Sequence, residues 1–240
     1  MTDAETNPEP EILAGRWILD GATPGAVLAR LPRCGRVMVV LSGGGATHER
    51  IGPVDSVLVD DLIVTIRGTV HNAIVETDRV RRIALDTTSV MRGKTYPALS
   101  LLDEAGEVLV NIVGMEDAGA FLAGFDGFTR TPVAPREKAD QGDTPAEVAD
   151  DPGMALLCAL AERAVPVTIS LALQGRSQSW SGTIGAVKPA MGFANVMTPD
   201  FHLHLKAGAV ATWVEAGGRH YAYDAGGQDI GLVLSEEAPA

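Results

Sequence analysis

The sequence predicts an α+β fold made of two tandem structural repeats, each an antiparallel β-sheet flanked by helices. Three observations lead to this fold class. Short runs rich in valine, isoleucine and threonine alternate with polar or glycine-containing breaks, as expected for short antiparallel strands. A helical pattern opens each half of the chain. Residues 98–114 also line up with residues 219–237, since each segment reads as a strand, an acidic glycine-containing turn and a second strand.

The first half begins with a short helix, in which Thr23 is the cap and Pro24 the first helical residue. Residues 36–42 (RVMVVLS) are a valine-rich strand, followed by a glycine-rich turn region. A second helix is expected over residues 115–125, where Phe121, Leu122 and Phe125 fall at helical spacing. The other predicted strand regions are residues 55–68, 71–77, 80–87, 97–103 and 107–114.

The second half begins with a helix that Asp151 caps and Pro152 starts, with an apolar stripe that includes Leu157. The predicted strand regions that follow are residues 165–173, 178–187, 193–197, 201–205, 209–216, 219–224 and 229–235. Residues 131–151 separate the halves and carry six acids, two bases and three prolines, a composition typical of a solvated linker. We therefore expect one repeat over residues 1–130, a linker over 131–150 and a shortened repeat over 151–240.

The composition excludes several functions. A net charge of −12 disfavours nucleic acid and anionic membrane surfaces as partners, because both attract an excess of Lys and Arg. No apolar run approaches the roughly 20 residues that span a bilayer, and the acidic start does not resemble a signal peptide. Cys34 and Cys158 are isolated and read as buried thiols rather than as a disulfide. These features predict a cytoplasmic protein without membrane insertion.

Two of the five histidines, His202 and His204, stand two residues apart in the strand FHLHL. Strand alternation places them with Lys206 on one face, and the phenylalanine and leucines of this run on the other. The histidines either cover a solvated sheet face or contribute to a metal site. A metal site needs a third ligand, for which His220 and His48 are options, because the segment after the strand contains no Glu before Glu215.

Matching the two halves upstream of the aligned hairpins sets His71 opposite His204. This alignment suggests that the two histidines are equivalent positions of the two repeats.

Two stretches, GFANVMTPDFHLHL and LPRCGRVMVVLSGGGATHERIGPV, resemble the bacterial haem-utilisation proteins of the HemS type and their shorter ChuX/HutX relatives. The first carries Phe193, Asn195 and Val196, followed by a run around His204. The second carries a Gly-x-Val-Met strand and Thr47-His48-Glu49 before Gly52. The run around His204 is the more specific of the two. The likeness extends from about residue 24 to about residue 235.

The resemblance implies a HemS-like fold and haem as the cofactor. Haem iron takes a neutral imidazole as axial ligand, and the propionates favour Arg or Lys. The HemS-type proximal histidine is missing, because the helix that opens the second half contains no His. Under this resemblance His204 or His71 is the candidate ligand of the haem iron, and His202 is a second contact. The candidate propionate partners are Arg67, Lys206 and Arg92.

The leading hypothesis is a haem-binding and trafficking protein of haem utilisation, which holds haem by axial histidine coordination. Its expected partners are haem and a haem importer or a haem-receiving protein, and a homodimer stays open. One alternative is an enzyme that degrades haem. Another is a diverged interaction or regulatory module that has lost haem, which the missing proximal histidine favours.

Overall fold

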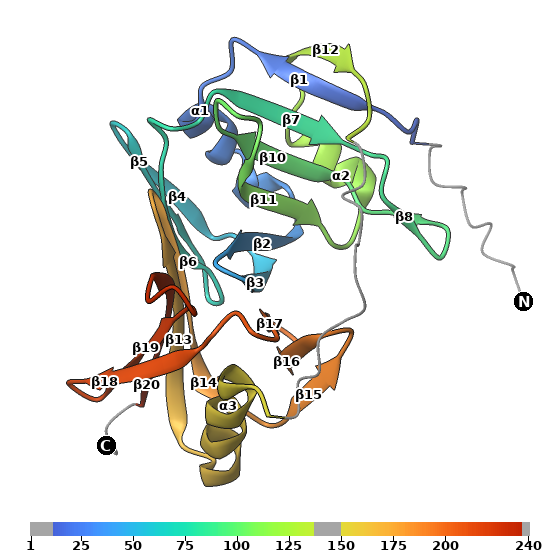
Figure 1. Cartoon of the computed structure of the whole chain (residues 1–240). Coiled ribbons are helices and arrows are strands. Elements are labelled where there is room, and N and C mark those ends of the chain that lie inside the picture. The colour runs from blue at the N-terminus through green and yellow to red at the C-terminus, as the bar shows by residue number, and fades with distance from the viewer. Residues whose placement is uncertain (1–11, 137–149, 237–240) are drawn as a thin grey trace, which may run out of the picture.

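Two large antiparallel sheets make up the protein (Figure 1). The computed structural model describes residues 12–136 and 150–236. In these residues the first half contains, in chain order, β1 (Arg16–Asp20), α1 (Pro24–Leu28), a 3₁₀ turn (Leu31–Arg33), β2 (Arg36–Gly43), β3 (Ala46–Pro53), β4 (Ser56–Asp60), β5 (Ile63–Arg67), β6 (Asn72–Glu76), β7 (Arg82–Asp86), β8 (Val90–Met91), β9 (Lys94–Thr95), β10 (Ala98–Leu102), β11 (Val108–Gly114), α2 (Ala118–Ala123) and β12 (Thr129–Val133).

The second half contains α3 (Pro152–Arg163), β13 (Pro166–Leu173), β14 (Arg176–Thr183), β15 (Val187–Ala190), β16 (Phe193–Met197), β17 (Phe201–Lys206), β18 (Thr212–Ala216), β19 (Arg219–Tyr223) and β20 (Asp229–Glu236). The expected α+β class with two repeats of antiparallel sheet and flanking helices is confirmed. Thr23 and Asp151 cap α1 and α3 as the sequence predicts, and proline occupies the first turn of both helices. Within the described residues no helix is both long and apolar enough to cross a bilayer.

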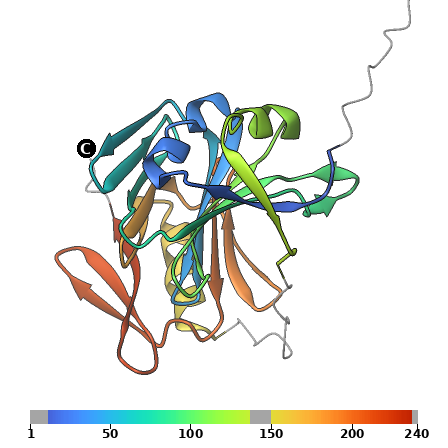
Figure 2. The same ribbon diagram turned by 90° about the horizontal axis from the view of Figure 1, so that it is seen from above.

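Each of the two large sheets contains strands from both halves, and β8 and β9 form a separate two-stranded sheet. The ten-stranded sheet has the order β12-β1-β7-β10-β11-β2-β3-β17-β16-β15, and the eight-stranded sheet has the order β18-β19-β20-β13-β14-β6-β5-β4. The three strands β4–β6 therefore leave the sheet of the first half and extend that of the second, while β15–β17 do the reverse. Seen from above, the β8–β9 and β18–β19 hairpins project from opposite sides of the molecule (Figure 2).

The strand registers fix which residues of the two halves are equivalent. Ala46 and Arg176 each follow the tight turn of a β-hairpin and lie 130 residues apart. Their partners on the exchanged strands, Leu205 and Val75, are also 130 residues apart.

This spacing corrects the repeat alignment that the sequence suggests. His204 is equivalent to Ile74, and His71 is equivalent to Phe201. The alignment based on the two histidines is wrong by three residues. Because side chains alternate along a strand, an odd shift also exchanges the two faces. His71 accordingly points into the protein and is 3% exposed, whereas His204 lies on the outer face.

The first residues of the expected linker belong to a strand. β12 pairs along its whole length with β1, so the ordered first half reaches at least Val133. The acidic linker residues 137–149 lie outside the described residues.

The core lies between the inner faces of the two sheets, with the helices packed against it. Leucine, valine and isoleucine side chains fill most of it. Near the centre Phe201 stacks on Trp180 with ring centroids 4.5 Å apart and lies 4.8 Å from His48. The opposite face of the ten-stranded sheet is turned outward and carries half-buried and exposed side chains of β2, β3, β16 and β17. The candidate site lies on this outer face.

Candidate functional site

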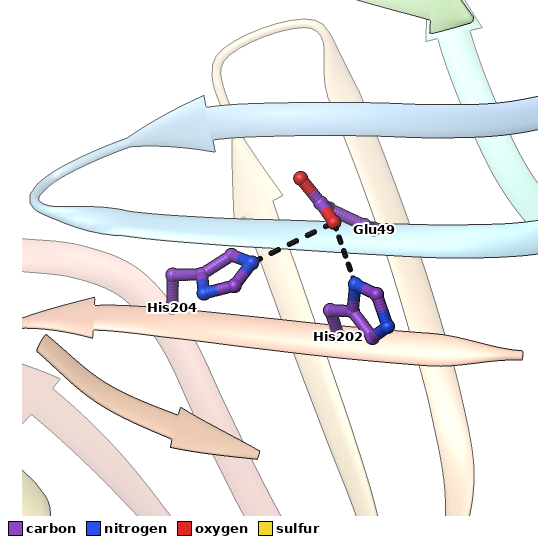
Figure 3. A group of neighbouring side chains, drawn as sticks. All are labelled: Glu49, His202 and His204. Carbon is purple, nitrogen blue, oxygen red and sulfur yellow. Dashed lines mark hydrogen bonds and ion pairs between the residues drawn. The ribbon is translucent and has the colours of Figure 1, made fainter. Parts of the chain in front are cut away.

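Three side chains from two neighbouring strands converge on the outer face of the ten-stranded sheet: Glu49 from β3, and His202 and His204 from β17 (Figure 3). His202 is the register partner of Glu49. His202 Nδ1 lies 3.0 Å from Glu49 Oε2, and His204 Nε2 lies 3.6 Å from the same oxygen. One ligand atom from each residue can be chosen so that all three lie within 4.8 Å of one another. We refer to these residues as the Glu49 cluster.

The local sequences explain why these side chains point outward. In β17 the buried Phe201, Leu203 and Leu205 alternate with the two histidines, as the sequence predicts. In β3, His48 and Arg50 are buried and Glu49 points outward. Neither strand alone reveals the cluster, because its members are brought together by a pairing across 153 residues between the two halves.

Electrostatics keep Glu49 ionised. Burial raises the pKa of its carboxyl group, but hydrogen bonds and charge interactions with His202 and His204 lower it by more, to about 2 against an ordinary value of 4.5. The side chain is 14% exposed. The cluster therefore presents an anionic oxygen beside two imidazoles in a partly dehydrated place.

Asn195 on β16 holds His204 from behind. Its amide nitrogen donates to the carbonyl oxygens of Lys188, Ala190 and Phe193. The amide oxygen is therefore the acceptor that faces His204 Nδ1, at 2.6 Å. It follows that His204 Nδ1 carries a proton and that Nε2 is the atom turned toward Glu49.

The other predicted site residues are scattered. Lys206 lies on β17 on the same face as the two histidines and is exposed. Arg67 is exposed on β5 of the eight-stranded sheet, and Arg92 is exposed in the turn between β8 and β9. His71 precedes β6, and its Nε2 bonds to the carbonyl oxygen of Gly52 at 2.9 Å. The structure thus brings His202 and His204 together and places Lys206 on the same face, whereas His71, Arg67 and Arg92 lie elsewhere.

Neither histidine considered from the sequence as a third metal ligand joins the cluster. His48 is fully buried on the opposite face of β3, where burial lowers its pKa to about 3. His220 lies on β19 of the other sheet, where its Nε2 is 3.9 Å from Glu236 Oε1. The third member of the cluster is Glu49, which the sequence reasoning missed. The alternation of inward and outward side chains in residues 46–51 would have placed Glu49 on the outer face. It would not have shown that Glu49 lies beside β17.

A cleft of about 600 Å³ lies along the same outer face, toward the first half. Val40 lines it, and the registers place Val40 between Glu49 on β3 and Asn111 on β11. Other lining residues come from β7, β10 and β11 and from the segment around β9, among them Tyr96, Ala98, Ser100, Val108 and Leu109. The Glu49 cluster therefore stands next to a cleft with a mixed polar and apolar lining.

No protein-family model matches the chain, and no curated protein matches it. Among solved structures, holo-PhuS, a heme-binding protein from Pseudomonas aeruginosa, is similar with a TM-score of 0.73 and 16% sequence identity, over 94% of this chain and 82% of that one. ChuS, an E. coli heme oxygenase, is similar with a TM-score of 0.72 and 15% identity, over 94% of this chain and 84% of that one. At these identities the likeness establishes the fold. The HemS-like fold expected from the sequence is thereby confirmed.

Proposed function

We propose that this protein binds haem and carries it in haem utilisation, with a histidine of the Glu49 cluster as the axial ligand. The observation that carries the proposal is the orientation of His202. Its Nδ1 is held by Glu49, and its Nε2 is directed away from the carboxylate (Figure 3). Within the described residues this Nε2 has no polar partner. A histidine that ligates a metal through one nitrogen commonly donates the other N–H to a carboxylate.

His202 suits the role better than His204, because both ring nitrogens of His204 already face polar groups, Asn195 on one side and Glu49 on the other. This preference reverses the order that the sequence suggested. His71 is unsuited, since it is buried and bonded to Gly52. Both alternatives are tested together with His202 below.

The surroundings fit a porphyrin. The exposed thioether of Met197 lies opposite His202, and the half-buried ring of Phe193 lies opposite Lys206. These groups and the cleft beside Val40 offer apolar contacts for a macrocycle, and Lys206 offers a cation for a propionate. When bound, haem supplies an iron centre that takes up and releases one imidazole, and this chain supplies the oriented imidazole. Reversible coordination suits a carrier that receives haem from an importer and passes it to a second protein in the cytoplasm. PhuS is described as a heme-binding protein, which agrees with this proposal.

Titration with hemin tests the proposal, followed through the Soret band with EDTA present. The wild type is expected to show a saturable shift at one haem per chain. His202→Ala should abolish the shift, while His71→Ala and Arg92→Ala should leave it unchanged. A wild-type titration without saturation, or one that His202→Ala and His204→Ala both leave unaltered, contradicts the proposal. Addition of ascorbate and catalase distinguishes the enzyme alternative, suggested by the likeness to the heme oxygenase ChuS, because only a haem-degrading protein forms a bilin.

A further inference from the structure

The Glu49 cluster has the composition and spacing of a mononuclear metal site in its own right. With metal–ligand bonds of about 2.1 Å, neighbouring ligand atoms around a tetrahedral or octahedral ion lie about 3.0–3.4 Å apart. The two nitrogen–oxygen separations in the cluster are 3.0 and 3.6 Å, and the three ligand atoms lie within 4.8 Å of one another, so small side-chain shifts would bring them to these distances. The side chains are 14% to 29% exposed, so water would reach the remaining coordination positions.

The proton positions around His204 leave a place for a cation. Since His204 Nδ1 donates to Asn195, a neutral His204 turns the bare lone pair of Nε2 toward the carboxylate oxygen of Glu49. Because Asn195 engages Nδ1, Nε2 is the ring nitrogen of His204 that is left to ligate an ion, and it faces the Glu49 oxygen at 3.6 Å.

The fold does not require this cluster. The spacing of 130 residues makes Ser179, Asn72 and Ile74 of the eight-stranded sheet equivalent to Glu49, His202 and His204. There Asn72 Nδ2 donates to Ser179 Oγ at 3.1 Å, and Ile74 is 42% exposed. The same strand pairing is thus built without imidazole or carboxylate. The strand pairing alone therefore does not account for the two histidines and the glutamate that occupy this place in the ten-stranded sheet.

We propose that Glu49, His202 and His204 bind one divalent first-row transition-metal ion, such as Zn²⁺, Co²⁺ or Fe²⁺. Two imidazoles and one carboxylate suit these ions, whereas Mg²⁺ and Ca²⁺ favour oxygen ligands throughout. Asn195 is the positioning residue that fixes the ring of His204. The site goes beyond haem binding and does not rest on it, because Glu49 ligates the ion directly but only orients His202 in the haem proposal.

Titration of the EDTA-treated and desalted full-length protein with Co²⁺ tests the site, since Co²⁺ bound by imidazole and carboxylate has a visible absorption spectrum. The wild type is expected to bind one Co²⁺ per chain, and Zn²⁺ should displace it while a large excess of Mg²⁺ should not. Glu49→Gln, His202→Asn and His204→Ile should each weaken binding by at least about 10-fold, and Asn195→Ala by about 10- to 100-fold. The histidine replacements are the residues of the equivalent place in the other sheet. Asn72→Ala in that place is the matched control and should bind like the wild type.

Unfolding of each metal-free variant in urea shows whether it is folded. Glutamine is almost isosteric with glutamate, so Glu49→Gln is the variant to use if a histidine variant does not fold. Absence of saturable Co²⁺ binding at one ion per chain in the wild type overturns the proposal. An undiminished affinity of folded Glu49→Gln for Co²⁺ also overturns the proposal. Asn195 contacts His204 but not His202, so Asn195→Ala is expected to weaken Co²⁺ binding and to retain the Soret shift with hemin, which separates this site from the haem proposal.

Discussion

His48 and Gln178 lie 130 residues apart and bond to each other at the centre of the protein, with Gln178 Nε2 3.0 Å from His48 Nδ1. They occupy equivalent places of the two repeats. His48 Nε2 bonds to the carbonyl oxygen of Ile169, and Gln178 Nε2 donates to the carbonyl oxygen of Val39, which is the equivalent position in the other half. The two bonds are thus related by the pseudo-twofold symmetry of the repeats, and they join the two sheets through buried polar groups.

Removal of this central amide should destabilise the protein. Gln178 is 2% exposed, and Gln178→Ala would leave the buried Nδ1 of His48 without its donor and would remove a hydrogen bond to the carbonyl oxygen of Val39. Buried groups left without a partner cost about 1–3 kcal/mol, so we expect the free energy of unfolding in urea to fall by at least that amount. Ser179→Ala, next in the chain but on the outer face, is the control and should change it by about 0.5 kcal/mol or less. Equal effects of the two substitutions would contradict a structural role for the central pair.

His71 should make the protein less stable in acid. Burial lowers the pKa of His71, the bond to the Gly52 carbonyl opposes this, and the charge of Arg50 adds to the lowering. An unfolded chain takes up a proton on this imidazole near pH 6.5, while the folded chain keeps it neutral, so stability is lost as the pH falls below that value. The loss amounts to at most about 1.4 kcal/mol per pH unit for one group.

His71→Gln tests this effect, because the amide can still donate to Gly52 but does not titrate. Urea unfolding between about pH 7 and pH 5 should show a shallower decline in stability for the variant than for the wild type. Parallel declines would mean that His71 is protonated as readily in the folded state as in the unfolded state.

The two cysteines should differ in reactivity. Cys34 is 2% exposed, its thiol donates to the carbonyl oxygen of Arg30, and burial raises its pKa to about 11. About 100-fold fewer Cys34 side chains are therefore thiolates than in an ordinary cysteine with a pKa of 9. We expect iodoacetamide to modify Cys158 first in the folded protein, and Cys158→Ser to remove the fast phase seen by mass spectrometry. Fast modification of Cys34 in folded Cys158→Ser would show that this part of the core opens readily.

Asp151 should stabilise the second half through two contacts. Its carboxylate accepts from Met154 N at the start of α3 and from Gly208 N in the loop after β17. Loss of a helix cap costs about 0.5–2 kcal/mol, and the loop contact adds to it, so Asp151→Ala should lower the free energy of unfolding by more than Asp151→Asn. The exposed neighbour Asp150 is the control, and Asp150→Ala should have little effect. An equal loss for Asp150→Ala would point to the overall charge rather than to the cap.

The local sequence carried the information for single elements but not for how they pair. Proline after a capping residue predicted the starts of α1 and α3, and alternation predicted that His202 and His204 share the outer face. Glu49 was missed because its contact with His202 depends on the exchange of strands between the halves. The prediction that His71 is equivalent to His204 was wrong because it matched residue types. The strand register decides which residues are equivalent, and it is fixed only by the pairing of β6 with β14.

The exchange of strands predicts that neither half folds by itself as a monomer. We propose that the two repeats form one folding unit. A chain of residues 1–136 lacks β15–β17, and a chain of residues 150–240 lacks β4–β6, so β3 and β14 would each become open edges. Each half alone is expected to be unfolded or self-associated. Mixed together, the halves should form a one-to-one complex with a cooperative unfolding transition, measured by size-exclusion chromatography and circular dichroism in urea. A half that unfolds cooperatively as a monomer would show instead that the repeats are independent domains.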